Sequence, residues 1–353
     1  MTLMHVTATK RGLALHAPGR QDRAAPGRAL AGRLARALEA LPQGAPVAVL
    51  VHGYRYSPLA PAADPHALLY DPRRGARWPA ALGFSAEDPR DGLCIGFGWP
   101  ASAGHVRSLL RHGRNGFAQV YRRAAGAGDL LAELLTLVNA IRPDLRCGVF
   151  AHSLGARVAL RALGAPGVGP VVLLGAAEHA SAARAALGAA GAAGAHVVNV
   201  ISRQNDLFDA MFERFAPAPA GAPGGALGRE GLGARRPDWI DLQLDHPAVE
   251  AWLAARGVPL GDARAPVCHW SFYARRNAMA FYACILRRPG AWSPAAMRAA
   301  GVPEVLAPRW ARLAPLRAAT AGAGFSVGGL RARAARALGA AGAGRPAEGG
   351  ALA

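Results

Sequence analysis

The amino-acid sequence predicts an α/β protein with a mainly parallel, doubly wound sheet that carries helices on both faces. Two observations lead to this fold class. Several short runs are continuously apolar, as strands buried on both sides are. Helical segments separate these runs along the chain, which is the order of a parallel sheet. With 353 residues, of which 52% are hydrophobic, the chain is long enough to bury a large core.

The elements of the first half follow in order. Leucines recur at helical spacing over 28–41 and predict an amphipathic helix. The first strong strand is predicted at 47–51, and a second at 93–97 ends before Trp99-Pro100. A strong helix is predicted over 129–141, because an apolar periodic run there is stopped by a proline.

The central elements alternate in the same way. An apolar strand begins at Val149, and a helix is predicted over 156–163. The next apolar run, 171–174, predicts a strand, 180–190 a helix and 196–201 a further strand. These alternations supply most of the predicted parallel sheet.

The last third is less regular. Residues 216–236 are rich in Pro, Gly and Ala, and we expect a mobile insertion or lid at about 211–237. A strand is predicted at 239–244 and a helix at 247–255. A loop follows, and a final helix runs through Leu286.

This pattern divides the chain into three parts. Residues 1–45 are expected to form an N-terminal extension with its amphipathic helix, and 46–290 the main α/β domain. Residues 291–353 are expected to be an Arg, Ala and Gly-rich tail, partly disordered.

One serine lies where a strand turns into a helix. Ser153 follows the apolar strand and stands between Ala151 and Gly155, two small residues that permit close approach of strand and helix. This is the form of a nucleophile elbow, with Ala in place of the usual first glycine. The sequence therefore predicts Ser153 as a nucleophile.

A serine hydroxyl needs a base, and the base needs an orienting acid. Asp206 follows the strand that ends at residue 201, and His269 comes later. Ser153, Asp206 and His269 therefore occur in the order nucleophile, acid, base, which is the order in hydrolases with a nucleophile elbow. Asp209 is the alternative acid. His246 is the alternative base, although its place before a proline at a helix start favours a capping role.

Two backbone N–H groups are expected to stabilise an oxyanion. One belongs to Leu154, which follows the nucleophile, and the other to Tyr54, in the loop after the first strong strand. His52, Gly53 and Arg55 of that loop are candidate substrate-binding residues. No metal ligands and no cofactor are predicted.

Four segments resemble the α/β-hydrolase superfamily, and within it a group of mostly bacterial, poorly characterised hydrolases. That group carries a His-Gly-Tyr loop, a Trp-Pro pair, an Ala-His-Ser-Met-Gly elbow and a late Gly-His-Ser-Tyr-Phe. The counterparts here are His52-Gly53-Tyr54, Trp99-Pro100, Ala151 to Gly155, and Cys268 to Phe272.

This resemblance covers about 46–286. It implies an α/β-hydrolase fold, hydrolysis of an ester or related acyl bond, Ser153 as nucleophile, Asp206 as acid and His269 as base. The chain departs from the group's pattern at Arg55, at Leu154 and around His269.

The formal charge of +19 invites comparison with nucleic-acid-binding proteins. Lys10 is the only lysine, however, and a chain dominated by Ala, Gly, Arg and Pro is typical of GC-rich coding, so we expect no nucleic-acid partner. Residues 287–353 carry ten arginines and two glutamates, and this basic tail could contact acidic surfaces.

Compartment and thiol chemistry follow from similar arguments. No apolar run approaches the ~20 residues of a membrane span, and no signal peptide is apparent at the start, so a cytoplasmic location is expected. The four cysteines lack metal-site spacing and are expected to be buried free thiols.

These features together predict a serine hydrolase, an esterase or lipase-like enzyme that acts on a small acyl substrate through an acyl-enzyme. Two alternatives stay open. One is a non-catalytic binding protein on the same scaffold, and the other is a thioesterase, amidase or acyltransferase.

Overall fold

The structure, a computed structural model, describes residues 2–16, 27–73, 77–85, 87–103, 116–190, 194–218, 225–263 and 265–313. The chain divides into two compact units, Met1–Arg309 and Trp310–Ala353. Of the second unit only a single 3-10 turn, Ala311–Leu313, is described as an element.

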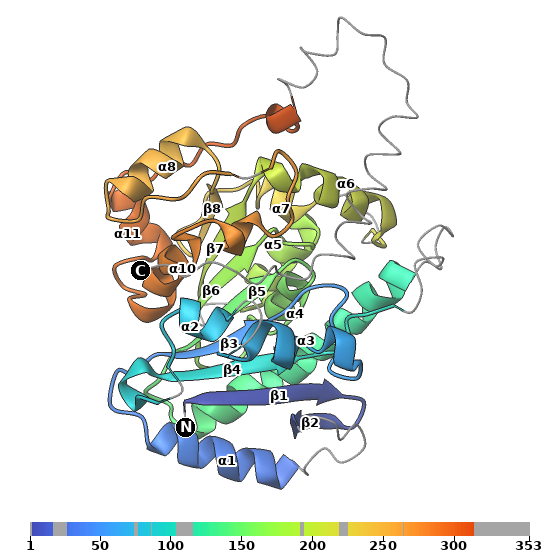
Figure 1. Ribbon diagram of the computed structural model, residues 1–353, viewed down its shortest axis with the longest axis vertical. Coiled ribbons are helices and arrows are strands. Elements are labelled where there is room, and N and C mark those ends of the chain that lie inside the picture. Colours follow the sequence, from blue (N-terminus) through green and yellow to red (C-terminus); the bar gives the residue numbers. More distant parts are fainter. Residues whose placement is uncertain are drawn as a thin grey trace, which may run out of the picture. The chain divides into compact units, whose positions relative to one another are not determined.

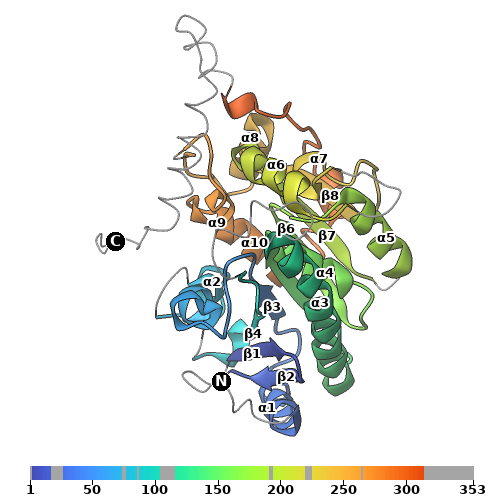
Figure 2. The same cartoon turned by 90° about the vertical axis from the view of Figure 1, so that its right-hand side faces the viewer.

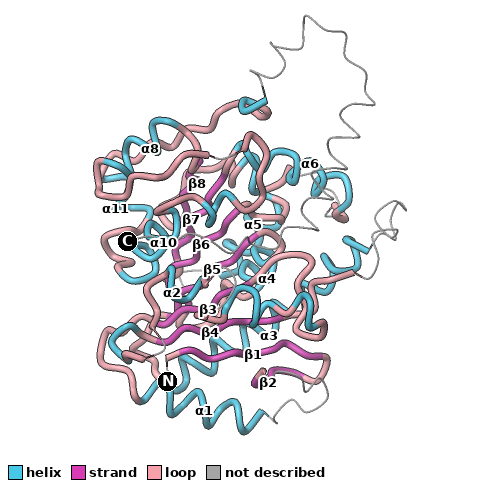
Figure 3. The backbone as a smooth tube through the Cα atoms, viewed as in Figure 1, coloured by secondary structure: helices cyan, strands magenta, loops and turns pink. Residues whose placement is uncertain are grey.

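Eight strands form one sheet in the order β2-β1-β4-β3-β5-β6-β7-β8 (Figure 1 and Figure 3). Neighbouring strands are parallel, apart from the antiparallel β1–β2 hairpin. The strands are β1 Leu3–Thr9, β2 Gly12–Leu15, β3 Val47–Val51, β4 Leu93–Gly98, β5 Cys147–His152, β6 Val168–Leu174, β7 His196–Ile201 and β8 Trp239–Gln243. The predicted α/β class with a mainly parallel sheet is confirmed.

Helices cover both faces of the sheet, as Figure 2 shows from the side. Alternate residues of β3 enter two different cores. Val47, Val49 and Val51 pack with α1, α3, α4 and α5, whereas Ala48 and Leu50 pack with α2, α8, α10 and α11. The helices are α1 Gly27–Glu39, α2 Trp78–Ala81, α3 Gly116–Ile141, α4 Gly155–Arg161, α5 Ala180–Ala190, α6 Asp206–Phe215, α7 Leu227–Glu230, α8 Pro247–Ala254, α9 Ser271–Ala274, α10 Ala278–Arg287 and α11 Pro294–Ala299.

The N-terminal segment contributes more to the sheet than the sequence suggested. In addition to the expected helix, α1, residues 3–15 form the β1–β2 hairpin, and β1 pairs with β4. The sequence of β1 contains no continuous apolar run, because His5 and Thr7 alternate with the apolar residues that fill the core side of this strand. The first 45 residues therefore supply two strands of the sheet itself, in addition to the helix.

The segment expected to be a mobile lid is largely packed in the structure. Residues 206–215 form α6 and 227–230 form α7, and Ala226, Leu227 and Leu232 are fully buried. Backbone N–H groups of Leu227 and Gly228 donate to the segment after β6. Residues 219–224 of the predicted insertion lie outside the described residues.

The start of the predicted tail is also folded. Residues 294–299 form α11, and the Ala307 N–H donates to the side chain of Gln243 at 2.7 Å. The low-complexity stretch beyond residue 313 lies outside the described residues. All four cysteines are free; Cys94 and Cys147 are buried and the other two half-buried.

One helix, α3, is long and apolar enough by length and composition to cross a membrane. Part of its apolar surface, including Leu131, Leu134 and Val138, is buried in the core. The helix also packs along α4 and against β5. Because a core helix of this kind passes the same test, the finding is weak evidence for a membrane span.

Candidate active site

Ser153 lies at the tight turn between β5 and α4. Its φ of 54° is in the left-handed region, which costs a non-glycine residue about 1–3 kcal/mol. The surrounding backbone holds this conformation, because the Ser153 N–H donates to the Leu174 carbonyl and the Ser153 carbonyl accepts from Ala156 and Ala177. The strand-to-helix turn expected from the sequence is therefore present, with the serine at its strained position.

Two glycines allow this turn to approach the loop after β3. A Cβ added to Gly53 would lie 2.7 Å from the Ser153 Cβ, and one added to Gly155 would lie 2.6 Å from the Val51 carbonyl oxygen. Neither glycine has room for a side chain. Gly53 is thus needed for packing against Ser153, and no substrate contact is required to explain it.

Replacing Gly155 should therefore damage the turn. We expect Gly155→Ala to lower the free energy of unfolding by about 1–3 kcal/mol, because the new methyl group meets rigid backbone. Urea unfolding measures the change. Gly126→Ala is the control, since nothing lies within 4 Å of that added Cβ on α3 and alanine should gain about 0.5–1 kcal/mol in a helix. Equal changes in both variants would contradict the packing argument.

His52 anchors the loop that faces Ser153. The side chain is fully buried, its Nε2 accepts from the Trp99 N–H at 3.0 Å, and the Trp99 indole donates to the His52 carbonyl at 3.0 Å. Burial lowers the pKa of His52 to about 4, so the ring is neutral. With both ring nitrogens engaged, by Trp99 and by the Gly53 carbonyl, His52 holds the loop against Trp99.

The same loop presents backbone donors. Among the described residues, the N–H groups of Tyr54 and Leu154 donate no hydrogen bond. The next residue, Arg55, is exposed with a φ of 81°, and its N–H donates to the Ala101 carbonyl. The two N–H groups expected to bind an oxyanion are thus free to donate. Tyr54 follows Gly53 and Leu154 follows Ser153, the two residues that are in close contact.

His269 lies beside the serine turn, in the segment before α9. Its backbone carbonyl is 3.1 Å from Nε2 of His152, the neighbour of Ser153, and the two imidazole rings are 4.5 Å apart. Phe208 of α6 stacks on the His269 ring at 4.5 Å. Burial, with His152 nearby, holds the pKa of His269 well below its usual range, so the imidazole is neutral and can accept a proton.

The structure does not join the two predicted groups directly. Within the described residues, no hydrogen bond links the Ser153 hydroxyl to the His269 ring. Catalytic hydrogen bonds are often long before substrate binds.

The third member of the predicted triad has a different position from the one expected. The Nδ1 of His269 lies 2.7 Å from Oδ1 of Asn205, not from the Asp206 carboxylate. Asp206 instead forms a buried ion pair with Arg203 at 3.0 Å. The partner of His269 is thus the residue immediately before the predicted one. Residues 203–205 form a 3-10 turn, and Asn205 and Asp206 therefore point in different directions where α6 begins.

The alternative acid, Asp209, is connected to His269 through Asn205. The Asn205 Nδ2 donates to Oδ1 of Asp209 at 3.0 Å. Because the amide nitrogen faces a carboxyl oxygen, the amide oxygen faces the imidazole, and Nδ1 of His269 carries the proton. His269, Asn205 and Asp209 therefore form a hydrogen-bonded chain.

Asp209 is an unusual carboxyl group. It is 2% exposed, and no described residue forms a hydrogen bond with its Oδ2. Burial raises the pKa of Asp209 to about 8, although the hydrogen bond from Asn205 opposes the shift. The carboxyl group is therefore protonated at pH 7. By accepting from the Asn205 amide nitrogen, it keeps the Asn205 amide oxygen turned toward His269.

This raised pKa predicts a pH-dependent stability. Between the unfolded value of 3.8 and about 8, the native state keeps a proton that the unfolded chain has lost. The contribution of Asp209 to stability therefore falls as pH rises through that window, by about 1.4 kcal/mol per unit, and is constant above pH 8. Asp209→Asn removes this dependence.

We expect the unfolding free energy of Asp209→Asn, minus that of wild type, to rise between pH 5 and pH 8 and then to level off. Urea unfolding at each pH measures the difference. Asp144→Asn is the control, because Arg142 lowers the pKa of this exposed carboxyl and no slope is expected above pH 5. A constant difference for Asp209→Asn would show that its pKa is not raised.

The remaining histidines of the prediction have structural positions. His246 caps α8, where its Nδ1 accepts from the Ala248 N–H at 3.2 Å. His152 is buried and positions the His269 backbone. Sequence reasoning missed Asn205 and Phe208. The signal for Asn205 was its place in the same strand-end loop as Asp206, and an amide serves this role in Cys-His-Asn proteases.

Comparison with known proteins adds no assignment. No protein-family model matches the chain, and no curated protein matches its sequence.

Proposed function

We propose that the protein is a serine hydrolase with an α/β-hydrolase fold that cleaves carboxylic esters through an acyl-enzyme. The single observation that carries the proposal is the left-handed Ser153 turn. It is flanked by the N–H groups of Tyr54 and Leu154, for which the described residues supply no acceptor. A strained backbone conformation with adjacent unsatisfied donors is explained by a developing negative charge on a substrate oxygen.

The first half-reaction follows from these groups. The Ser153 hydroxyl attacks the ester carbonyl carbon while Nε2 of His269 accepts its proton, and the oxyanion binds the Tyr54 and Leu154 N–H groups. Collapse of the tetrahedral intermediate breaks the bond to the alcohol oxygen. The alcohol leaves with the proton from His269, and the acyl group stays on Ser153.

Water completes the cycle. His269 takes a proton from a water molecule, whose oxygen attacks the acyl carbonyl, and the same donors hold the second oxyanion. The carboxylic acid is released and the Ser153 hydroxyl regains its proton. Throughout, Asn205 accepts the Nδ1–H of His269 at 2.7 Å and so selects the tautomer that leaves Nε2 free.

Aromatic side chains around these groups favour an apolar acyl or alcohol portion. Tyr54 contacts Phe117 with ring centroids 5.1 Å apart, and Phe208 covers His269. Arg55 of the same loop is exposed. We therefore propose neutral esters as the substrate class.

The test is a rapid-mixing assay with p-nitrophenyl esters of two to eight acyl carbons. The acyl-enzyme mechanism predicts a burst of nitrophenol that approaches one equivalent per chain, followed by slower turnover. The slow phase should depend on the acyl group. Release no faster than in buffer with every ester would contradict the proposed function and favour a non-catalytic binding protein.

A further inference from the structure

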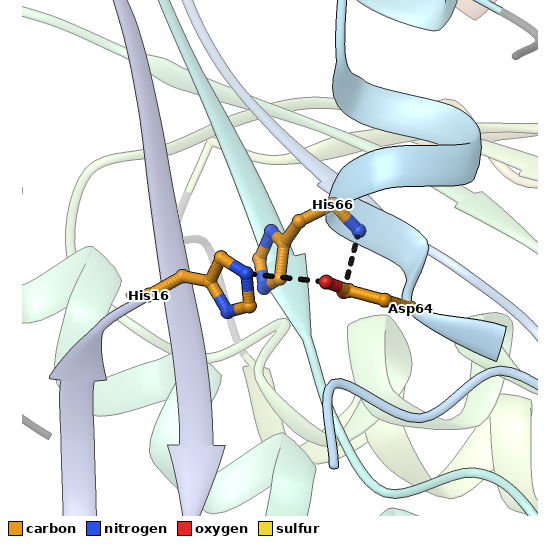
Figure 4. Close-up of side chains that lie close together, drawn as sticks. All are labelled: His16, Asp64 and His66. Atoms are coloured by element: carbon orange, nitrogen blue, oxygen red, sulfur yellow. Dashed lines mark hydrogen bonds and ion pairs between the residues drawn. The ribbon is translucent and has the colours of Figure 1, made fainter. Parts of the chain in front are cut away.

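A second cluster of chemically active side chains lies at the N-terminal edge of the sheet. His16 follows β2, and Asp64 and His66 lie between β3 and α2, where residues 66–70 form a short π-helical turn. Figure 4 shows these three side chains directed toward one another. None of them contributes to the candidate active site.

The cluster brings together donors of the type that bind transition metals. One ring nitrogen of each histidine and one carboxylate oxygen of Asp64 all lie within 4.8 Å of one another. The Nε2 of His16 is 3.2 Å from Oδ2 of Asp64. The other oxygen of Asp64, Oδ1, accepts the backbone N–H of His66 at 3.0 Å, which fixes the orientation of the carboxylate.

One ring nitrogen of His66 is not engaged by the described residues. His66 is 2% exposed, and within the described part of the chain its buried Nδ1 has no hydrogen-bond partner, whereas its Nε2 lies 3.1 Å from the Thr7 hydroxyl. Histidine ligands usually have one nitrogen on a metal and the other on a hydrogen-bonding group of this kind. A buried nitrogen with no partner otherwise carries a desolvation penalty.

A third histidine extends the cluster. His5 of β1 stacks on His66 with ring centroids 4.9 Å apart, and its Nε2 is also buried without a partner. Among the described residues, these two stacked histidines therefore each have one buried ring nitrogen without a hydrogen-bond partner.

The His16 and His66 rings stack with centroids 3.9 Å apart. An ion lies near the plane of each ring that binds it, so one ring must turn. His16 can do so by rotation of its side chain, since its backbone is held separately by a hydrogen bond to the His5 carbonyl.

We propose that His16, Asp64 and His66 form a binding site for a zinc ion. Two imidazoles and one carboxylate suit Zn²⁺, with metal–ligand distances of about 2.0–2.2 Å, and leave a fourth position for water. Such an ion would tie the β1–β2 hairpin to the segment between β3 and α2. That segment packs on β4, because a Cβ on Gly98 would lie 2.4 Å from Nε2 of His66.

The experiment is calorimetric titration of chelator-treated, full-length protein with Zn²⁺ alone. We compare wild type with His16→Asn and Asp64→Asn, neither of which removes a large core side chain. Asp64→Asn also keeps an oxygen that can accept the His66 N–H. His246→Asn is the matched control, because it removes a histidine from the α8 cap and retains a capping side chain.

Wild type and His246→Asn should bind one ion per chain with equal affinity, and both site variants should bind at least tenfold more weakly. Substitution with Co²⁺ should give the visible absorption of a four-coordinate site in wild type and His246→Asn, and not in the two site variants. The proposal is overturned if wild type shows no saturable binding, or if His16→Asn and Asp64→Asn bind Zn²⁺ as tightly as wild type. Ester hydrolysis is measured separately, so failure of either proposal leaves the other intact.

Discussion

Ser153→Ala should lower kcat/KM for p-nitrophenyl esters by about 10⁴-fold or more, to a rate near that without protein. The reason is that the hydroxyl is the only group at the apex of the strained turn that can form the acyl-enzyme. Removal of Oγ leaves the backbone donors of Tyr54 and Leu154 in place, so substrate binding should persist. Steady-state kinetics with wild type and variant measure the effect.

A serine elsewhere in the fold provides the control. Ser293 caps α11, where its hydroxyl accepts from the Ala296 N–H at 3.2 Å. Ser293→Ala should lower stability by about 1 kcal/mol and leave kcat/KM unchanged at a temperature where both proteins are folded. Retention of full esterase activity in folded Ser153→Ala would remove this serine from the mechanism.

Asn205→Ala should give the second largest effect, a fall in kcat/KM of about 10²-fold. The substitution removes the acceptor that holds Nδ1 of His269 and so frees the ring to adopt the wrong tautomer. Asn205→Asp restores an acceptor, and the protonated Asp209 carboxyl can then donate to it, so activity should recover in part. Stability alone would not produce this order of activities.

Asp206→Asn separates the two candidate partners of His269. Because Arg203 is buried with Asp206, loss of one charge should destabilise the protein by about 3–5 kcal/mol. Activity of the folded fraction should stay close to that of wild type. The opposite pattern, with Asp206→Asn inactive but stable and Asn205→Ala active, would restore Asp206 as the acid predicted from chain order.

The fold was largely predictable because its central strands are buried on both faces. All five residues of β3 and all seven of β6 are buried, so their sequences contain no polar interruption. The β1–β2 hairpin was not predictable in this way, because in β1 His5 and Thr7 alternate with apolar residues, and the Thr7 hydroxyl faces the polar side chain of His66.

The candidate site shows a similar limit. The small residues around Ser153 predict the strand-to-helix turn that the structure has, and His269 lies beside that turn. The partner of His269 depends instead on the direction of successive side chains in a 3-10 turn, where one residue changes the direction completely. Chain order alone favours a carboxylate, and so it selected Asp206 over its neighbour Asn205.

The most direct test of the central claim is fluorophosphonate labelling of the full-length protein, followed by peptide mapping by mass spectrometry. The reagent phosphonylates activated serine hydroxyls. We expect one adduct per chain, on Ser153. Formation of this adduct should be much slower in His269→Ala and in Asn205→Ala. Labelling that is absent, or that falls on another residue and survives Ser153→Ala, would contradict the claim that Ser153 is the nucleophile.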